Sequence, residues 1–164
     1  MTLVLRRALP ADVPLIRELI AGLAAYEKLS NACVATEALL LEHLFGARPH
    51  AEVVIAEYNM ETAGFALYFH NFSTFLARPG IYLEDLFIWP AYRGHGIGKA
   101  LLQYLAVLAI DRGCGRLEWS VLNWNVDAIG FYKRLGARAQ DDWTVYRVTG
   151  NDLTTLANGL DGED

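Results

Sequence analysis

The middle of the chain carries an apolar run followed by a glycine-rich loop, Tyr82-Leu83-Glu84-Asp85-Leu86-Phe87-Ile88-Trp89-Pro90-Ala91-Tyr92-Arg93-Gly94-His95-Gly96-Ile97-Gly98-Lys99. The apolar run ends at Pro90 and predicts a strand over Ile81 to Ile88. Closely spaced glycines let the backbone turn tightly and let a ligand approach its amides. The first turn of a helix has unpaired N–H groups and a positive dipole end, which suit a phosphate. The pattern therefore predicts a strand, a phosphate-binding loop and a helix.

Two familiar phosphate loops fit this pattern poorly. A Walker A loop needs Ser or Thr after Gly-Lys, but Gly98-Lys99 is followed by Ala100. A dinucleotide fingerprint needs Gly-x-Gly-x-x-Gly at the first strand–helix turn of its unit, whereas Gly94, Gly96 and Gly98 alternate and follow several strands. On the glycines alone, a plain connecting loop remains an alternative.

Working outward, the residue pattern predicts an order β-α-α-β-β-β-α-β-α-β. Asp12 is a candidate N-cap of the first helix, which runs to about Tyr26, and Thr36 of the second, which Gly46 ends. Such mixing of elements predicts an α/β (α+β) fold with a mainly antiparallel sheet, helices on its faces and one strand–helix–strand crossover. The remaining predicted elements are strands at 3–7, 52–58, 63–72, 81–88, 116–122 and 144–148, and helices at 96–112 and 126–135.

Length and composition limit the function classes. At 164 residues, without a repeat or a Pro/Ser-rich linker, the chain predicts one domain over 1–164. No apolar run approaches the roughly 18–20 residues that span a bilayer, and the N-terminus does not resemble a signal peptide, so we expect a cytoplasmic protein without membrane contact. The net charge of −5 argues against nucleic acid and is compatible with a cationic substrate.

Cysteine and histidine spacing gives no sign of a metal site. Cys33 and Cys114 are far apart and are interpreted as two reduced thiols. The four histidines form no HxxxH or HxH pair. We therefore expect no metal cofactor.

Arg93-x-x-Gly96-x-Gly98 after an apolar strand, with Asn125 and Phe131-Tyr132 further on, resembles the GCN5-related N-acetyltransferase (GNAT) superfamily. The Tyr82 to Asp85 strand, Trp124-Asn125, the run from Phe131 to Ala137 and Ala25-Tyr26-Glu27 resemble its diamine branch, which includes spermidine/spermine and thialysine acetyltransferases. The resemblance covers nearly the whole chain. It implies a sheet of six to seven strands, about four helices and a homodimer.

The resemblance also implies a reaction: acetyl transfer from acetyl-CoA to a primary amine of a diamine, polyamine or thialysine/lysine-like molecule, by direct attack in a ternary complex. Tyr132 would protonate the departing sulfur, and Glu84 would accept the amine proton directly or through water. The residues that the resemblance places at acetyl-CoA are Leu86, Phe87, Ile88, Arg93, Gly94, His95, Gly96, Ile97, Gly98, Lys99, Asn125, Asp127, Ala128 and Tyr132.

Glu84 and Asp85 are candidate functional residues even without the family resemblance. Adjacent acids inside an apolar strand are costly unless they are used or paired. In a regular strand they point to opposite faces, unless a bulge, which the superfamily has in this strand, brings them together. The alternative is an edge strand with two solvated acids. The residues that the resemblance places at the amine are Tyr26, Glu27, Glu84, Asp85, Glu118, Trp119 and Trp143.

Residues 71–80 depart from the polyamine enzymes, which have an acid and a tryptophan where this chain has Ser73, Thr74 and Phe75. This run is more similar to the thialysine-acetylating relatives and favours a short diamine or a lysine-like amino acid. Two other functions stay open: acetylation of a protein N-terminus or lysine, and a non-catalytic acyl-CoA-binding module.

Overall fold

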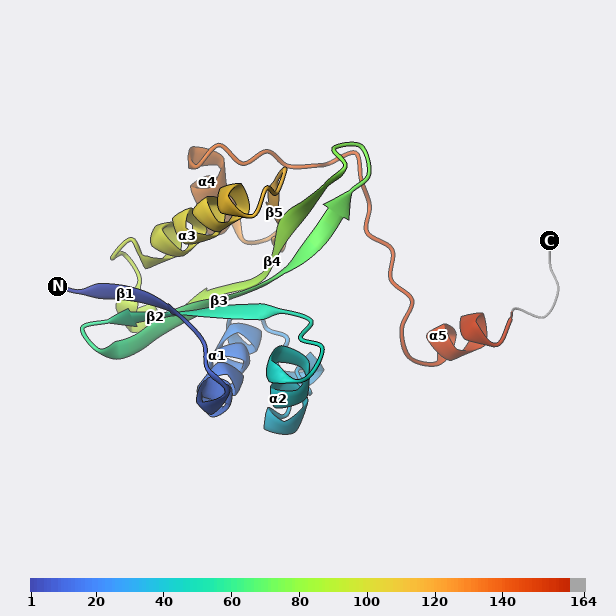
Figure 1. Cartoon of the computed structure of the whole chain (residues 1–164), viewed down its shortest axis with the longest axis horizontal. Helices are drawn as coiled ribbons and strands as arrows, with labels where there is room; N and C mark the ends of the chain where they lie inside the picture. The colour runs from blue at the N-terminus through green and yellow to red at the C-terminus, as the bar shows by residue number, and fades with distance from the viewer. Residues whose placement is uncertain (160–164) are drawn as a thin grey trace. The chain divides into compact units, whose positions relative to one another are not determined.

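The computed structural model describes residues 1–159 (Figure 1). The chain divides into two compact units, Met1–Leu122 and Asn123–Asp164, the second of which is described up to Gly159. No helix within the described residues is long and apolar enough to cross a membrane.

The first unit is built on a five-stranded sheet in the order β1-β2-β3-β4-β5. Neighbouring strands are antiparallel except β4 and β5, which are parallel. A parallel pair needs a crossover, and α3 (Ile97–Asp111) supplies it. The strands are β1 (Leu3–Arg7), β2 (Glu52–Tyr58), β3 (Glu61–Ser73), β4 (Arg78–Ile88) and β5 (Leu117–Trp119). The predicted mixed sheet with one crossover is confirmed.

Helices cover both faces of this sheet, with α1 (Val13–Tyr26) and α2 (Glu37–Phe45) on one face and α3 on the other (Figure 1). Ile16 and Leu19 of α1 pack in one buried cluster with Ile55 of β2, Phe65 of β3 and Phe87 of β4. Three short 3₁₀ turns complete the unit, at Pro10–Asp12, Ser30–Ala32 and Pro90–Tyr92. The core thus fixes the C-terminal half of β4, where the predicted site begins.

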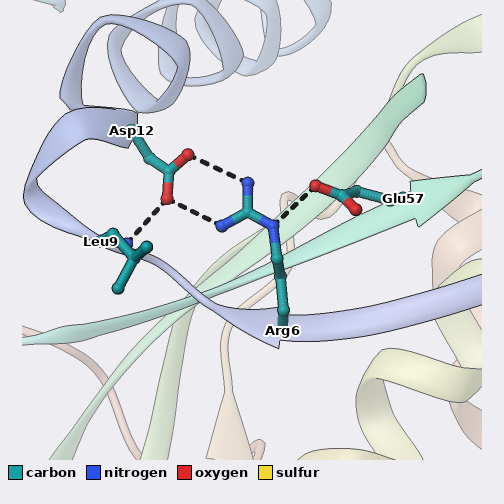
Figure 2. A network of polar contacts seen from close by, with 4 residues as sticks. All are labelled: Arg6, Leu9, Asp12 and Glu57. Atoms are coloured by element: carbon teal, nitrogen blue, oxygen red, sulfur yellow. Dashed lines mark hydrogen bonds and ion pairs between the residues drawn. The ribbon is translucent and has the colours of Figure 1, made fainter. Parts of the chain in front are cut away.

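The two predicted N-caps behave differently. Thr36 caps α2 as expected, because its hydroxyl accepts from the Leu39 amide at 3.2 Å. Asp12 precedes α1, but its side chain does not cap this helix. Its carboxylate accepts two hydrogen bonds from Arg6, at 2.8 and 3.0 Å, and one from the Leu9 amide at 2.7 Å (Figure 2). Arg6 of β1 also donates to Glu57 of β2. The Asp12 carboxylate that was expected to cap α1 therefore pairs with an arginine of β1 instead.

A second ion-pair network ties α3 to the sheet. Arg112, just after α3, donates to both Glu52 oxygens, at 2.6 and 3.0 Å, and Arg7 donates to one of them at 2.8 Å. These hydrogen bonds hold the pKa of Glu52 below its ordinary value, although burial opposes them. The end of the crossover helix is therefore fastened to β1 and β2.

The second unit contains α4 (Val126–Arg134) and α5 (Gly150–Ala157). The strand predicted at 144–148 is wrong, because these residues are exposed and join no sheet. The described residues accordingly form five strands and five α-helices, where six to seven strands and about four helices were expected. The residue pattern did not predict α5.

Candidate functional site

The two adjacent acids lie at an irregularity of β4. Leu83 pairs with Tyr68 of β3 and Asp85 pairs with Leu67, so Glu84 has no partner residue on β3. An extra residue of this kind is a β-bulge, which changes the direction of the side chains around it. The expected bulge is present, and strict alternation does not force Glu84 and Asp85 onto opposite faces.

Three carboxylates influence one another at this bulge. Glu84 is exposed and Asp85 is half-buried. Burial, and then the charges of Glu84 and Glu27, raise the pKa of Asp85 to about 7. Burial and the charge of Glu84 also raise the pKa of Glu27, the C-cap residue that follows α1. The result is a local negative potential that suits an ammonium group.

The edge of β4 toward β5 is only partly paired. β5 pairs with Ile81 to Leu83, and no strand within residues 1–159 pairs with Leu86 to Ile88 on that edge. An unpaired strand edge offers backbone N–H and C=O groups to an extended ligand. Three residues that the resemblance places at acetyl-CoA, Leu86, Phe87 and Ile88, thus lie at an open strand edge.

The glycine loop has the features of an anion site. Gly94 and Gly96 have φ of +81° and +75°, which side chains other than glycine rarely adopt. Gly96 is the N-cap of α3 and no side chain caps this helix. A Cβ atom added at Gly94, Gly96 or Gly98 would meet nothing within 4 Å, so the space before the loop is open. Lys99 is exposed in the first turn of α3, beside these free amide donors.

The side chain of Arg93 contacts the end of α1 and the C-terminal part of β4. Its Nε donates to the carbonyl oxygen of Ile88 at 3.0 Å, and its guanidinium lies 4.7 Å from the ring centroid of Tyr26 and 5.8 Å from that of Phe87. The side chain therefore joins the phosphate loop to the end of α1. The resemblance placed Arg93 at acetyl-CoA and gave no indication of its contact with Tyr26.

Two residues predicted at the amine lie on β5. Glu118 accepts from Asn71 at 3.1 Å and forms an ion pair with Arg116 at 3.2 Å. Its charge is therefore partly balanced by neighbours. Trp119 is half-buried next to it.

The other predicted residues belong to the second unit. Asn125 caps α4, since its side-chain oxygen accepts from the Ala128 amide at 3.3 Å, and Asp127 is in the first turn. Tyr132 is half-buried on α4, with its ring centroid 5.6 Å from that of Phe131. Trp143 is 80% exposed. Within residues 1–159, no group of three or more His, Cys, Asp or Glu side chains could hold a metal ion.

Comparisons with known proteins point to one family. The model of the Acetyltransferase (GNAT) family matches residues 23–137. The chain is 34% identical to L-ornithine N5-acetyltransferase NATA1 of Arabidopsis thaliana, over 93% of this chain and 86% of that protein. It is 36% identical to thialysine N-epsilon-acetyltransferase of Bos taurus, over 93% and 96%. An integron cassette protein from V. cholerae has a solved structure that matches with a TM-score of 0.82 at 29% identity, over 97% of this chain and 99% of that one.

Proposed function

Since the chain belongs to the acetyltransferase (GNAT) family, we propose that it transfers the acetyl group of acetyl-CoA to a primary amine of a small molecule. The observation that carries this proposal is the acid cluster, which consists of Glu27, Glu84 and Asp85 and lies at the bulge of β4. The same unit has an open strand edge and a helix N-terminus without a side-chain cap. We propose that residues 1–164 act as one catalytic domain, with Tyr132 as the proton donor.

The residues at the loop and at the β4 edge fit an acyl-CoA. Glycines without a nearby neighbour leave room for a pyrophosphate at the α3 amides. Leu86, Phe87 and Ile88 offer backbone groups to an amide-bearing arm. Bound acetyl-CoA supplies an activated thioester, and the protein contributes position, charge and protons.

The acid cluster prepares the amine. An amine with a pKa near 10 arrives protonated, and the negative potential at Glu27, Glu84 and Asp85 favours its binding. Glu84 is the most exposed member of the cluster and accepts the ammonium proton, directly or through water. The neutral nitrogen can then attack the thioester carbonyl carbon.

Tyr132 completes the proposed reaction. As the carbon–sulfur bond breaks, the Tyr132 phenol donates its proton to the sulfur and the free thiol leaves. The nitrogen loses its second proton to water as the amide forms, and the Tyr132 phenolate takes a proton back from water, which restores the phenol. Holding both reactants in attack geometry supplies on the order of several kcal/mol of the lowered barrier.

The relatives support a short substrate with a primary amine at one end. Ornithine and thialysine, which appear in the names of two relatives, are short amino acids that each carry a terminal amine. Ser73, Thr74 and Phe75 in place of an acid and a tryptophan favour the same class over a long polyamine. We therefore propose a lysine-like amino acid or short diamine as acceptor.

We also propose that the protein is a cytoplasmic homodimer that contacts neither nucleic acid nor membrane. Cys33 and Cys114 are both free thiols, which is compatible with a reducing compartment. Exposed Val145 and Tyr146 of the second unit offer apolar surface for a second copy.

The test is release of free thiol from acetyl-CoA with putrescine, spermidine, ornithine, thialysine, lysine and a lysine-bearing peptide. We expect release with one or two small amines. Tyr132→Phe should lower turnover by roughly 10²–10⁴-fold while acetyl-CoA binding is kept. Tyr104→Phe, at a tyrosine of α3 that is half-buried like Tyr132 and has no proposed role, is the matched control.

Two results would contradict the proposal. Release with the peptide alone would favour protein acetylation. Tight acetyl-CoA binding without release for any amine would favour a binding module.

A further inference from the structure

The β2–β3 turn touches the phosphate loop from a distant part of the chain. Tyr58 ends β2, and its ring centroid lies 6.3 Å from that of Tyr92, in an edge-to-face arrangement, and 5.0 Å from that of His95. Aromatic pairs at such distances are attractive beyond their buried area. One ring of the turn thus contacts both ends of the segment 92–95.

A hydrogen bond adds to this contact. The Tyr92 hydroxyl donates to Glu61, the first residue of β3. This bond raises the pKa of the Tyr92 phenol, as expected when a carboxylate accepts from it. Tyr58 and Glu61 flank the two turn residues, Asn59 and Met60, so the turn contacts the loop at two points.

Within the loop, the His95 ring that contacts Tyr58 also forms hydrogen bonds to the loop backbone. Its Nδ1 lies 3.1 Å from the Tyr92 carbonyl oxygen and 3.0 Å from the Arg93 carbonyl oxygen. Carbonyl oxygens only accept, so Nδ1 carries the proton in these hydrogen bonds. The His95 ring therefore fixes the backbone that leads into Gly94 and Gly96.

We propose that Tyr58 and Glu61 are positioning residues that hold the loop 92–96 in the conformation that binds the pyrophosphate of the acyl donor. The inference rests on the proposed function, because it concerns the donor site of that reaction. Glycine residues lose more conformational freedom on ordering than any others, and Gly94 and Gly96 have no side chains to pack. Contacts from a hydrogen-bonded hairpin lower this cost before the ligand binds.

The experiment compares two acyl donors. Acetyl-CoA contains the pyrophosphate, whereas S-acetyl-pantetheine lacks both the pyrophosphate and the adenosine. We expect Tyr58→Ala and Glu61→Ala each to raise the KM for acetyl-CoA about three- to tenfold, with kcat and the KM for S-acetyl-pantetheine unchanged. Tyr58→Phe keeps the ring and Glu61→Gln keeps an acceptor, so both should bind acetyl-CoA nearly as the wild type does.

The sign of the Glu61→Ala effect separates positioning from charge. Removing a negative charge near a phosphate site strengthens phosphate binding if electrostatics alone acts. Positioning predicts weaker binding. Met60→Gln, at a residue 96% exposed in the same turn, is the matched control and should change neither KM. Because Glu61 is exposed, its replacement leaves the core intact.

Unchanged or tighter acetyl-CoA binding in Glu61→Ala and Tyr58→Ala would overturn the inference. An equal loss with both donors would also overturn it, because that loss would be general. Calorimetric titration of the wild-type protein with CoA distinguishes failure of the positioning inference from failure of the proposed function. A wild-type protein that binds no CoA would contradict the donor site itself.

Discussion

At the scale of single residues, Asp85 sits in a setting that disfavours its charge. Its pKa is raised from an ordinary 3.8 to about 7 by burial and by Glu84 and Glu27. A carboxyl with a raised folded-state pKa destabilises the fold only where the unfolded chain is ionised. The loss of folding stability caused by the Asp85 charge is therefore absent below about pH 4, grows between pH 4 and 7, and reaches its full size above pH 7.

We expect Asp85→Asn to stabilise the protein at pH 8 by about 1–4 kcal/mol and to have little effect at pH 4. The measurement is the urea midpoint at both values. Asp141→Asn, at an exposed acid of the second unit, is the control and should change neither midpoint. An equal effect of Asp85→Asn at both pH values would show that ionisation is not the cause.

At the scale of elements, the β2–β3 turn contains backbone strain that a single substitution can relieve. Asn59 and Met60 have φ of +51° and +68°, the backbone of a two-residue hairpin turn with both central residues left-handed. Asn tolerates this conformation, but for Met it costs roughly 1–2 kcal/mol. Glycine avoids that cost and loses part of the gain to its greater freedom when unfolded.

Met60→Gly is therefore expected to raise stability by about 0.5–1 kcal/mol, measured as the thermal midpoint. Met60→Ala keeps a left-handed Cβ and should leave the midpoint nearly unchanged. A lower midpoint for the glycine variant would mean that the Met60 side chain stabilises the turn despite its exposure.

Local elements could be predicted from the sequence, and long-range ones could not. The strands at Leu3–Arg7 and Glu52–Tyr58 were predicted with their observed bounds, because their residue types and flanking turns agree. The strand expected at 144–148 had suitable residues, but strand formation needs a partner strand, and propensity does not supply one. The helix α5 has only eight residues and was missed, although Leu153, Leu156 and Ala157 recur at helical spacing.

The same division applies to the candidate site. The glycine loop and the Glu84-Asp85 pair could be recognised within one continuous segment. The contacts of Arg93 with Tyr26 and of Tyr58 with His95 join residues far apart in sequence, so only the packed sheet brings them together.

At the scale of the whole molecule, two ion-pair networks make the stability of the first unit depend on pH. Hydrogen bonds from Arg6 lower the pKa of Asp12, and hydrogen bonds from Arg112 lower that of Glu52. Groups with a lowered folded-state pKa stabilise the protein above their unfolded pKa, near 4. That contribution is lost as the pH falls through their folded-state values.

We expect the double variant Arg6→Met, Arg112→Met to lose about 1–3 kcal/mol at pH 7 and to approach the wild type near pH 3, in urea denaturation. Arg138→Met, at an exposed arginine of the second unit, is the control. A gap that stays constant from pH 7 to pH 3 would mean that the carboxylates do not contribute through these hydrogen bonds.

The half-open edge of β4 has a consequence beyond the reaction. Leu86, Phe87 and Ile88 combine unpaired backbone groups with apolar side chains, which is the template on which strands of separate chains assemble into aggregates. A donor molecule that occupies this edge covers the template. In the proposed enzyme, we therefore expect a bound acyl donor to protect the protein from aggregation through this edge, in addition to supplying the acetyl group.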